Sequence, residues 1–370
     1  MLVLVRCCER TKVYSYRDLW AQVFEERSAW LVDVCIAANA MIACISYCLL
    51  IERFLEIAIR GLLPGTFLAA APPEVKLGIV VVFFIFPLCL KRDLSSLRST
   101  SLVGLAVTLL VAGYVAQDFF SHAWEPLPSR GGLTSMEVLS TWDRQPGAYL
   151  LQAAAILTNA FSVHYNVPKL YGEVPEAQRN VATFRNVIIA AFGFTLITEL
   201  VFMVCGYGRF GASVESTLLS SYAFEPLSLA CWVCMAANIA CTYPIVFQAA
   251  RSSILATLKQ ALGPRLPPID RGVFTAALVA LTAVLGHSLD GLSFISAVKG
   301  ALALSAIAFV FPGLMHLRIF DRRPGAREAE EAAEAGGGGG GASRWQAFSK
   351  LLVAWGAMSA AVGLAVIALR

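Results

Sequence analysis

The sequence is poor in charged residues. Only 15% of its 370 residues are charged, whereas soluble domains carry about 25%. Hydrophobic residues make up 58% of the chain, and the mean hydropathy is +0.68. So few polar side chains cannot cover the surface of a soluble domain, and the long apolar runs predict an all-α membrane protein whose first partner is the lipid bilayer.

Motifs of several other protein classes are also missing. The sequence contains no nucleotide-binding loop and no Ser/His/Asp set, and its four histidines lie on different segments without the spacing of metal ligands. The net charge of +4 is too small to suggest nucleic acid, and most of the ten cysteines lie inside apolar runs, where thiols pack as small hydrophobes. We therefore expect no enzyme, no metal, no resident cofactor and no nucleic-acid partner.

The apolar runs predict nine membrane-crossing helices, since one crossing needs about 20 apolar residues. They are 29–51, 73–90, 100–117, 149–174, 182–208, 226–250, 273–287, 292–317 and 348–369. A charged stretch and six consecutive glycines separate the last two. The predicted organisation is a transmembrane core over 1–317, a charged and glycine-rich cytoplasmic linker over 318–347, and a last helix over 348–370.

The Lys and Arg residues predict the orientation of these helices. With nine crossings, the loops on the side of the N-terminus carry about three times as many Lys and Arg as the opposite loops. This bias places the N-terminus in the cytoplasm and the C-terminus outside the cell or in a lumen. The choice between plasma membrane and lysosome or vacuole stays open, as does the oligomeric state.

The crossing predicted at 149–174 is the richest in polar residues. Asn159, Ser162 and His164 lie at its centre, and Pro168 disfavours helix at the residue before it. This pattern predicts a broken helix, unwound near Phe161 to His164, and unwound backbone in a membrane is tolerated where it lines a cavity. The alternative is a Pro-kinked packing helix with a hydrogen-bonded histidine.

Four more polar residues fall inside predicted crossings. Asn238 and Thr242 are four residues apart and share a helix face, which suits either two cation ligands or ordinary interhelical hydrogen bonds. Glu199 and Lys299 could pair between helices or titrate during transport. Lys299 could instead reach the membrane interface along its aliphatic stem.

Several motifs, in order, resemble one family of membrane proteins. The segment 159–173, with its aromatic residues, His164, Tyr171 and Glu173, resembles the helix-six signature of the amino acid/auxin permease family, which includes the sodium-coupled neutral amino acid transporters. The proline is one place early, and Tyr165-Asn166 replaces the commoner Pro-Glu. Further similar segments are 15–19, 86–90 with 94–101, 206–211, 243–244 with Arg251, and 311–314.

The resemblance implies the leucine-transporter fold of the APC superfamily, with eleven helices of which the nine crossings would be helices three to eleven. The N-terminus would then lack helix one and most of helix two. Phe161, Ser162 and His164, together with Asn159, would line the substrate pocket. Thr242 matches a helix-eight threonine of the family's cation site. Asn238 is added to this site only because it lies four residues before Thr242 on the same helix face.

The function implied is secondary active transport of amino acids, most simply neutral ones, by alternating access and coupled to Na⁺ or H⁺. Two alternatives stay open. The chain could be an amino acid sensor or receptor, which would bind without transport, or a non-transporting remnant that serves as a partner subunit.

Overall fold

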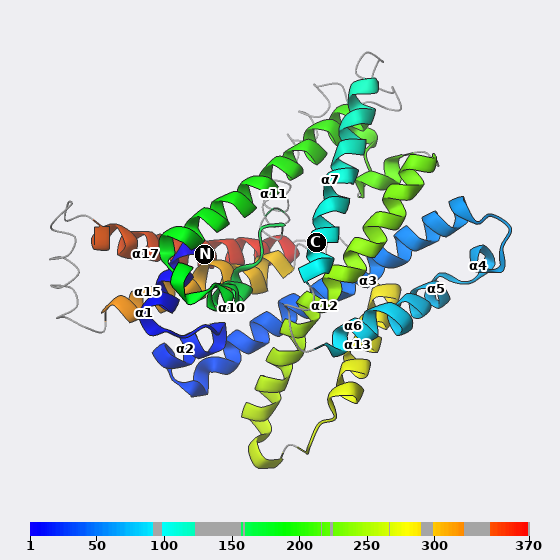
Figure 1. Ribbon diagram of the computed structural model, residues 1–370. Coiled ribbons are helices and arrows are strands. Elements are labelled where there is room, and N and C mark those ends of the chain that lie inside the picture. Colours follow the sequence, from blue (N-terminus) through cyan, green and yellow to red (C-terminus); the bar gives the residue numbers. More distant parts are fainter. Residues whose placement is uncertain are drawn as a thin grey trace.

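The computed structural model describes residues 1–91, 98–122, 157, 160–215, 217–222, 225–265, 267–289, 299–321 and 341–368. Every regular element in these ranges is helical, and none is a strand (Figure 1). Six helices in this part of the chain are long and apolar enough to cross a membrane. The prediction of a helical membrane protein is therefore confirmed for the described residues.

The crossing-length helices alternate with shorter elements. They are α3 (Ala29–Leu62), the continuous α5 (Pro73–Val80), π-helical η2 (Val81–Ile85) and α6 (Phe86–Leu90), then α7 (Arg98–Ser121), α11 (Val181–Phe210), α12 (Pro226–Leu262) and α13 (Arg271–Ser288). The others used below are α1 (Leu2–Thr11), α2 (Tyr16–Phe24), α10 (Val167–Glu173), π-helical η9 (Gly300–Leu304) and η10 (Ala306–Val310), α15 (Phe311–Asp321) and α17 (Gly341–Ala368).

Local sequence sets several helix ends. The side chains of Asn180 and Asp270 accept hydrogen bonds of 2.8 Å from the third residue of α11 and of α13, so each satisfies one of the free amides of a first turn. Helix α12 ends at Gly263, whose φ of +53° is the left-handed backbone that glycine adopts readily. Such signals are short in range and can be read from sequence.

The helices differ from the predicted crossings at some ends. Helices α3 and α12 are longer than expected, because polar residues at their ends continue the helical hydrogen bonding beyond the apolar run. Helix α17 begins at Gly341 rather than at Phe348, and α15 continues to Asp321, so both ends of the predicted linker are helical. The crossings predicted at 149–174, 292–317 and 348–369 include residues outside the described ranges and stay predictions.

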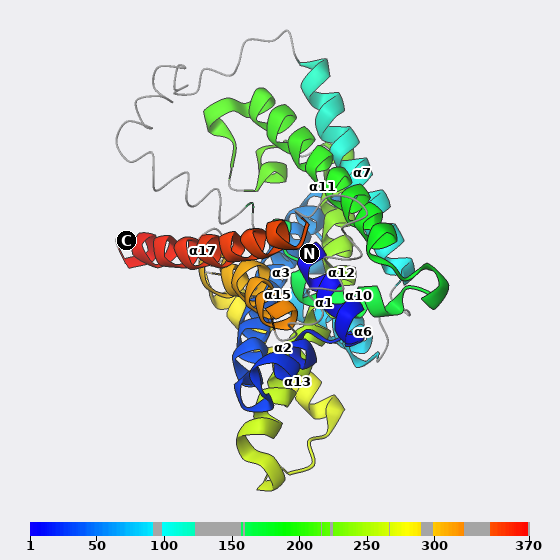
Figure 2. The same ribbon diagram turned by 90° about the vertical axis from the view of Figure 1, so that its left-hand side faces the viewer.

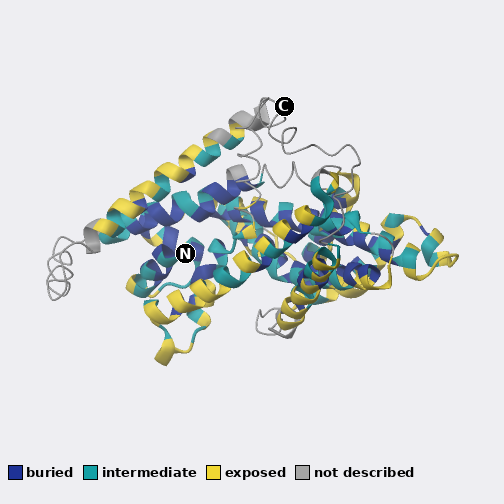
Figure 3. Ribbon diagram, turned by 90° about the horizontal axis from the view of Figure 1, so that it is seen from above, coloured by how far each residue is buried: buried dark blue, intermediate teal, exposed yellow. Residues whose placement is uncertain are grey.

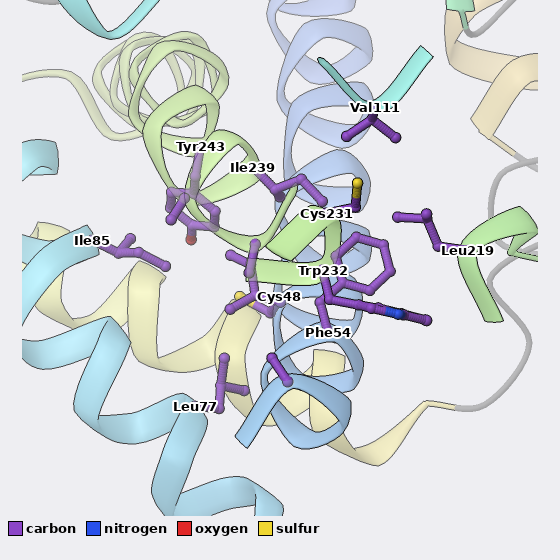
Figure 4. Close-up of a cluster of buried hydrophobic side chains, with 14 of the residues drawn as sticks. Cys48, Phe54, Leu77, Ile85, Val111, Leu219, Cys231, Trp232, Ile239 and Tyr243 are labelled. Atoms are coloured by element: carbon purple, nitrogen blue, oxygen red, sulfur yellow. The ribbon is translucent and has the colours of Figure 1, made fainter. Parts of the chain in front are cut away.

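Helices α3 and α12 pack along each other through the centre of the molecule (Figure 1). The main hydrophobic core forms around them and includes side chains from α5, η2, α6, α7 and α13. Figure 4 shows Phe54 of α3 beside Trp232 of α12, with ring centroids 5.0 Å apart in an edge-on arrangement. This core joins the helices into one scaffold.

A second core joins α1, α2, the start of α3, α10 and α15. Helix α17 packs on α15 and the π-helical segments, and Figure 2 shows it lying beside α15. Outward-facing residues are exposed along the helices while buried residues gather where helices meet (Figure 3). Many of the exposed side chains are large and apolar, among them Phe83 and Val273, as expected of a lipid-facing surface.

Candidate functional site

The structure places a helix break in the segment where the sequence predicts one. Residues Phe161 to Val163 are not α-helical, and His164 to Asn166 form one 3₁₀ turn before α10 starts at Val167. Pro168 falls in the first turn of α10, where its missing N–H costs no helical hydrogen bond. Asn159 lies outside the described residues. The break leaves main-chain groups outside regular helical bonding at this point of the chain.

Two of the predicted pocket residues lie against other helices. The Phe161 ring stacks on Phe192 of α11 with a centroid separation of 5.4 Å, and the His164 ring lies 6.4 Å from that of Phe309 in η10. Ser162, which lies between Phe161 and His164 in the sequence, is half-buried. Buried Nδ1 of His164 has no hydrogen-bond partner among the described residues. A buried polar nitrogen without a partner is costly, so this atom is suited to meet a polar ligand.

Thr242 and Asn238 share one face of α12, and their side chains make different contacts. The Thr242 hydroxyl donates to the main-chain oxygen of Asn238 at 2.9 Å. The Asn238 side-chain oxygen instead lies against α7, 2.5 Å from where a Cβ on Gly104 would stand. No described residue donates a hydrogen bond to the Thr242 hydroxyl, whereas the Asn238 side chain packs between two helices.

Glu199 and Lys299 are both half-buried. Among the described residues the structure forms no ion pair between them; Glu199 lies on α11, and Lys299 directly precedes η9, which packs on α3. The predicted pairing of these two charges therefore has no support in the described part of the chain.

A cavity of about 610 Å³ lies next to the helix break. Tyr165 and Asn166, which directly follow His164, form part of its wall. The rest comes from Tyr14 and Ser15 and from α2, α3, α10, α12 and the start of α13. Its charged lining residues are Arg17, Lys169, Arg251, Arg271, Asp18 and Asp33. The four basic residues all belong to the set that the charge bias assigns to the cytoplasmic side. The volume falls in the range of small-molecule sites, about 300–1,000 Å³.

Arg17 forms an ion-pair cluster at one wall of this cavity. Its guanidinium pairs with Asp33 of α3, which is only 2% exposed, and with Glu26 at 2.7 Å. It also donates to the side chain of Gln260 on α12 at 3.2 Å. Partial burial lowers the pKa of Arg17, but the hydrogen bond to Glu26 and the charge of Asp33 outweigh this and raise it overall. Arg17 thereby joins α2, α3 and α12 as a permanent cation.

Two further arginines of the cavity lining hold the end of α6. Arg251 donates from Nη1 to the main-chain oxygen of Cys89 at 2.7 Å and to the Thr275 hydroxyl at 2.9 Å. Arg271 donates from Nη2 to the main-chain oxygen of Lys91 at 3.1 Å. These carbonyls end a helix, where the partial negative charge of the helix dipole favours cations.

Sequence reasoning missed these arginine contacts. Asp33 is an ionisable residue in an apolar run of the sequence, which is a signal for a buried partner but does not say which residue supplies it. Arg251 directly follows the predicted crossing 226–250, and that position does not indicate its partners. The pairs join residues far apart in the chain, and no local pattern reveals them.

Together, the long apolar helices define a multi-pass integral membrane protein, and a polar cavity lies beside its helix break. A family model, "Transmembrane amino acid transporter protein", matches residues 1–329, and the chain belongs to this family. The family consists of transporters and not of enzymes, as the sequence predicts.

Curated relatives support the family assignment at low identity. The chain is 23% identical over 327 residues to a Danio rerio protein named provisionally as sodium-coupled neutral amino acid transporter 11, covering 87% of this chain and 69% of the relative. It is 23% identical to amino acid transporter AVT1D of Arabidopsis thaliana, and the match covers 86% of this chain and 55% of that relative. It is 22% identical to sodium-coupled neutral amino acid transporter 7 of Mus musculus, and the match covers 85% of this chain and 68% of that relative. The chain thus spans between about half and about two thirds of the length of these relatives.

Proposed function

We propose that this protein carries out secondary active transport of amino acids across a membrane, most simply of neutral amino acids. The family membership supports this, and so do the names of its relatives. The substrate would bind at the helix break, where main-chain groups, the Ser162 hydroxyl and the His164 ring can meet an ammonium and a carboxylate.

The main support for a substrate site at the helix break is the state of Nδ1 of His164. It is buried and has no hydrogen-bond partner among the described residues, although buried polar atoms are normally paired. A ligand at the helix break would supply the missing partner. Phe161 and Phe309, which lie beside the break, would provide the apolar part of the pocket.

The proposed cycle is alternating access in a leucine-transporter fold, driven by Na⁺ or H⁺. The mutual packing of α3 and α12 would form the static part, and the broken helix with α10 would belong to the moving part. For Na⁺, Thr242 is the proposed ligand, since no described residue donates a hydrogen bond to its hydroxyl oxygen. Asn238 is the weaker of the two proposed ligands because its side chain packs against α7. The N-terminus is proposed to lie in the cytoplasm.

The test is uptake of a radiolabelled mixture of the twenty amino acids into proteoliposomes that contain the full chain, with an imposed Na⁺ or H⁺ gradient. Ser162→Trp fills the space at the helix break and should abolish the uptake that the unchanged chain shows. Ser213→Trp is the matched control, since Ser213 is exposed beyond the end of α11, and it should leave uptake unchanged.

Two outcomes would contradict the proposal. Undiminished uptake by Ser162→Trp would remove the helix break as the substrate site. Binding of labelled amino acids by the unchanged chain without any uptake would indicate a sensor and not a transporter.

A further inference from the structure

The cavity beside the helix break carries an excess of positive charge. At one wall, Arg17 is paired with the carboxylates of Asp33 and Glu26 and does not contribute to this excess. The remaining charged lining residues are Lys169, Arg251 and Arg271 against the single exposed carboxylate of Asp18. A cavity with this balance favours an anion over a cation.

The two arginines meet no carboxylate in the described part of the chain. Arg251 is 6% exposed, and the hydrogen bonds of both arginines to described residues go to neutral oxygens, namely main-chain carbonyls and one hydroxyl. Neutral acceptors position a guanidinium but do not cancel its charge. Nε of Arg271 is also buried without a partner among the described residues. Buried cations and unpaired donors are costly, and an anion in the cavity would satisfy both.

The arginines stand next to each other. Arg251 binds the carbonyl of Cys89 and Arg271 binds those of Leu90 and Lys91, which are consecutive residues at the end of α6. Arg251 also reaches Thr275, one helical turn along α13 from Arg271. Side-chain guanidinium groups recognise planar carboxylates in a bidentate manner, and Lys169 adds a further positive charge to the lining of the cavity.

We propose that this cavity is a second binding position for amino acids, which holds the α-carboxylate between Arg271, Arg251 and Lys169. The proposal rests on the proposed transport function and places this position on the route between the helix break and the cytoplasmic side. Tyr165 and Asn166 line the cavity and directly follow His164 in the chain, so the cavity wall begins next to the proposed substrate site. The side chain of the amino acid would face the apolar part of the wall, such as Ile36 and Ile245.

The first experiment measures thermal unfolding of the purified full chain with increasing acetate, a carboxylate without the rest of an amino acid, at constant ionic strength set with chloride. Binding to the folded state raises the unfolding midpoint. Lys169→Gln and Arg271→Gln should each weaken the apparent acetate affinity about tenfold, the scale of one lost charge-assisted contact. Arg185→Gln removes an equal charge from an exposed position on α11 and should change nothing.

Lys169→Gln keeps this test valid if Arg271→Gln fails to fold, since Lys169 is exposed at the cavity rim and makes no side-chain hydrogen bond to the described residues. Acetate stabilisation that is equal in the unchanged chain and in Lys169→Gln would overturn the proposal. So would equal stabilisation by acetate, by chloride and by inorganic phosphate, which would indicate a general anion site.

The second experiment separates this proposal from the proposed function. Equilibrium binding of the radiolabelled amino acid mixture is measured in Ser162→Trp, whose site at the helix break is blocked. A weak binding phase should remain in this variant and disappear when Lys169→Gln is added. A Ser162→Trp chain without the weak phase would overturn the second position even if the unchanged chain transports. Loss of uptake alone bears only on the proposed function, because the acetate titration needs no transport.

Discussion

Gly286 allows α13 to lie directly against α3, and its replacement by alanine tests whether this close approach stabilises the scaffold. A Cβ on Gly286 would stand 2.7 Å from Cβ of Cys48, 2.9 Å from the main-chain oxygen of Ile45 and 3.2 Å from the main-chain nitrogen of Leu49. Two of these three atoms belong to the backbone of α3. A side-chain rotation cannot relieve such contacts, so α13 would have to move away.

The expected cost is the balance of two effects. Forcing an extra methyl group into a packed interface costs about 1–3 kcal/mol. Exchanging glycine for alanine inside a helix returns about 0.5–1 kcal/mol. We expect a net loss of about 1–2 kcal/mol for Gly286→Ala. Gly113→Ala in α7 is the matched control, since no described atom lies within 4 Å of its Cβ position, and only the favourable helix effect should appear there.

The assay is unfolding of the purified chain in mixed micelles with increasing dodecyl sulfate, followed by helical circular dichroism. Gly286→Ala should unfold at a lower dodecyl sulfate fraction than the unchanged chain, and Gly113→Ala at the same or a higher fraction. A Gly286→Ala chain as stable as Gly113→Ala would refute the close contact between α13 and α3.

Two further predictions concern the cavity and the coupling ion. A double-mutant cycle of Arg17→Gln and Asp33→Asn, measured by unfolding, should yield a coupling energy of about 1–3 kcal/mol. Removing one member of the pair leaves the other partly buried and unpaired. A coupling energy near zero would mean that the pair does not stabilise the fold. If uptake depends on Na⁺, Thr242→Ala should raise the half-saturating Na⁺ concentration about tenfold, the scale of one lost contact to a charge, while unchanged Na⁺ activation would exclude Thr242 from the ion site.

The sequence by itself determined the membrane class, most of the crossings and the helix break. These follow from apolar runs, from Pro168 and from capping residues such as Asp270, all of which act on neighbours within a few residues. The order of short motifs also led to the family, which the family model over residues 1–329 confirms. Local interactions carry all of this information.

Only the tertiary structure decided which polar residues meet. Arg251 finds the carbonyl of Cys89, 162 positions away in the chain, and Arg17 finds Gln260, 243 positions away. The same packing placed the Asn238 side chain against Gly104 of α7, a contact that its position on one helix face with Thr242 does not reveal. Spacing along a helix sets which direction a residue faces, but the neighbouring helix decides what stands opposite it. The basic cavity exists for that reason: segments remote in sequence bring its walls together.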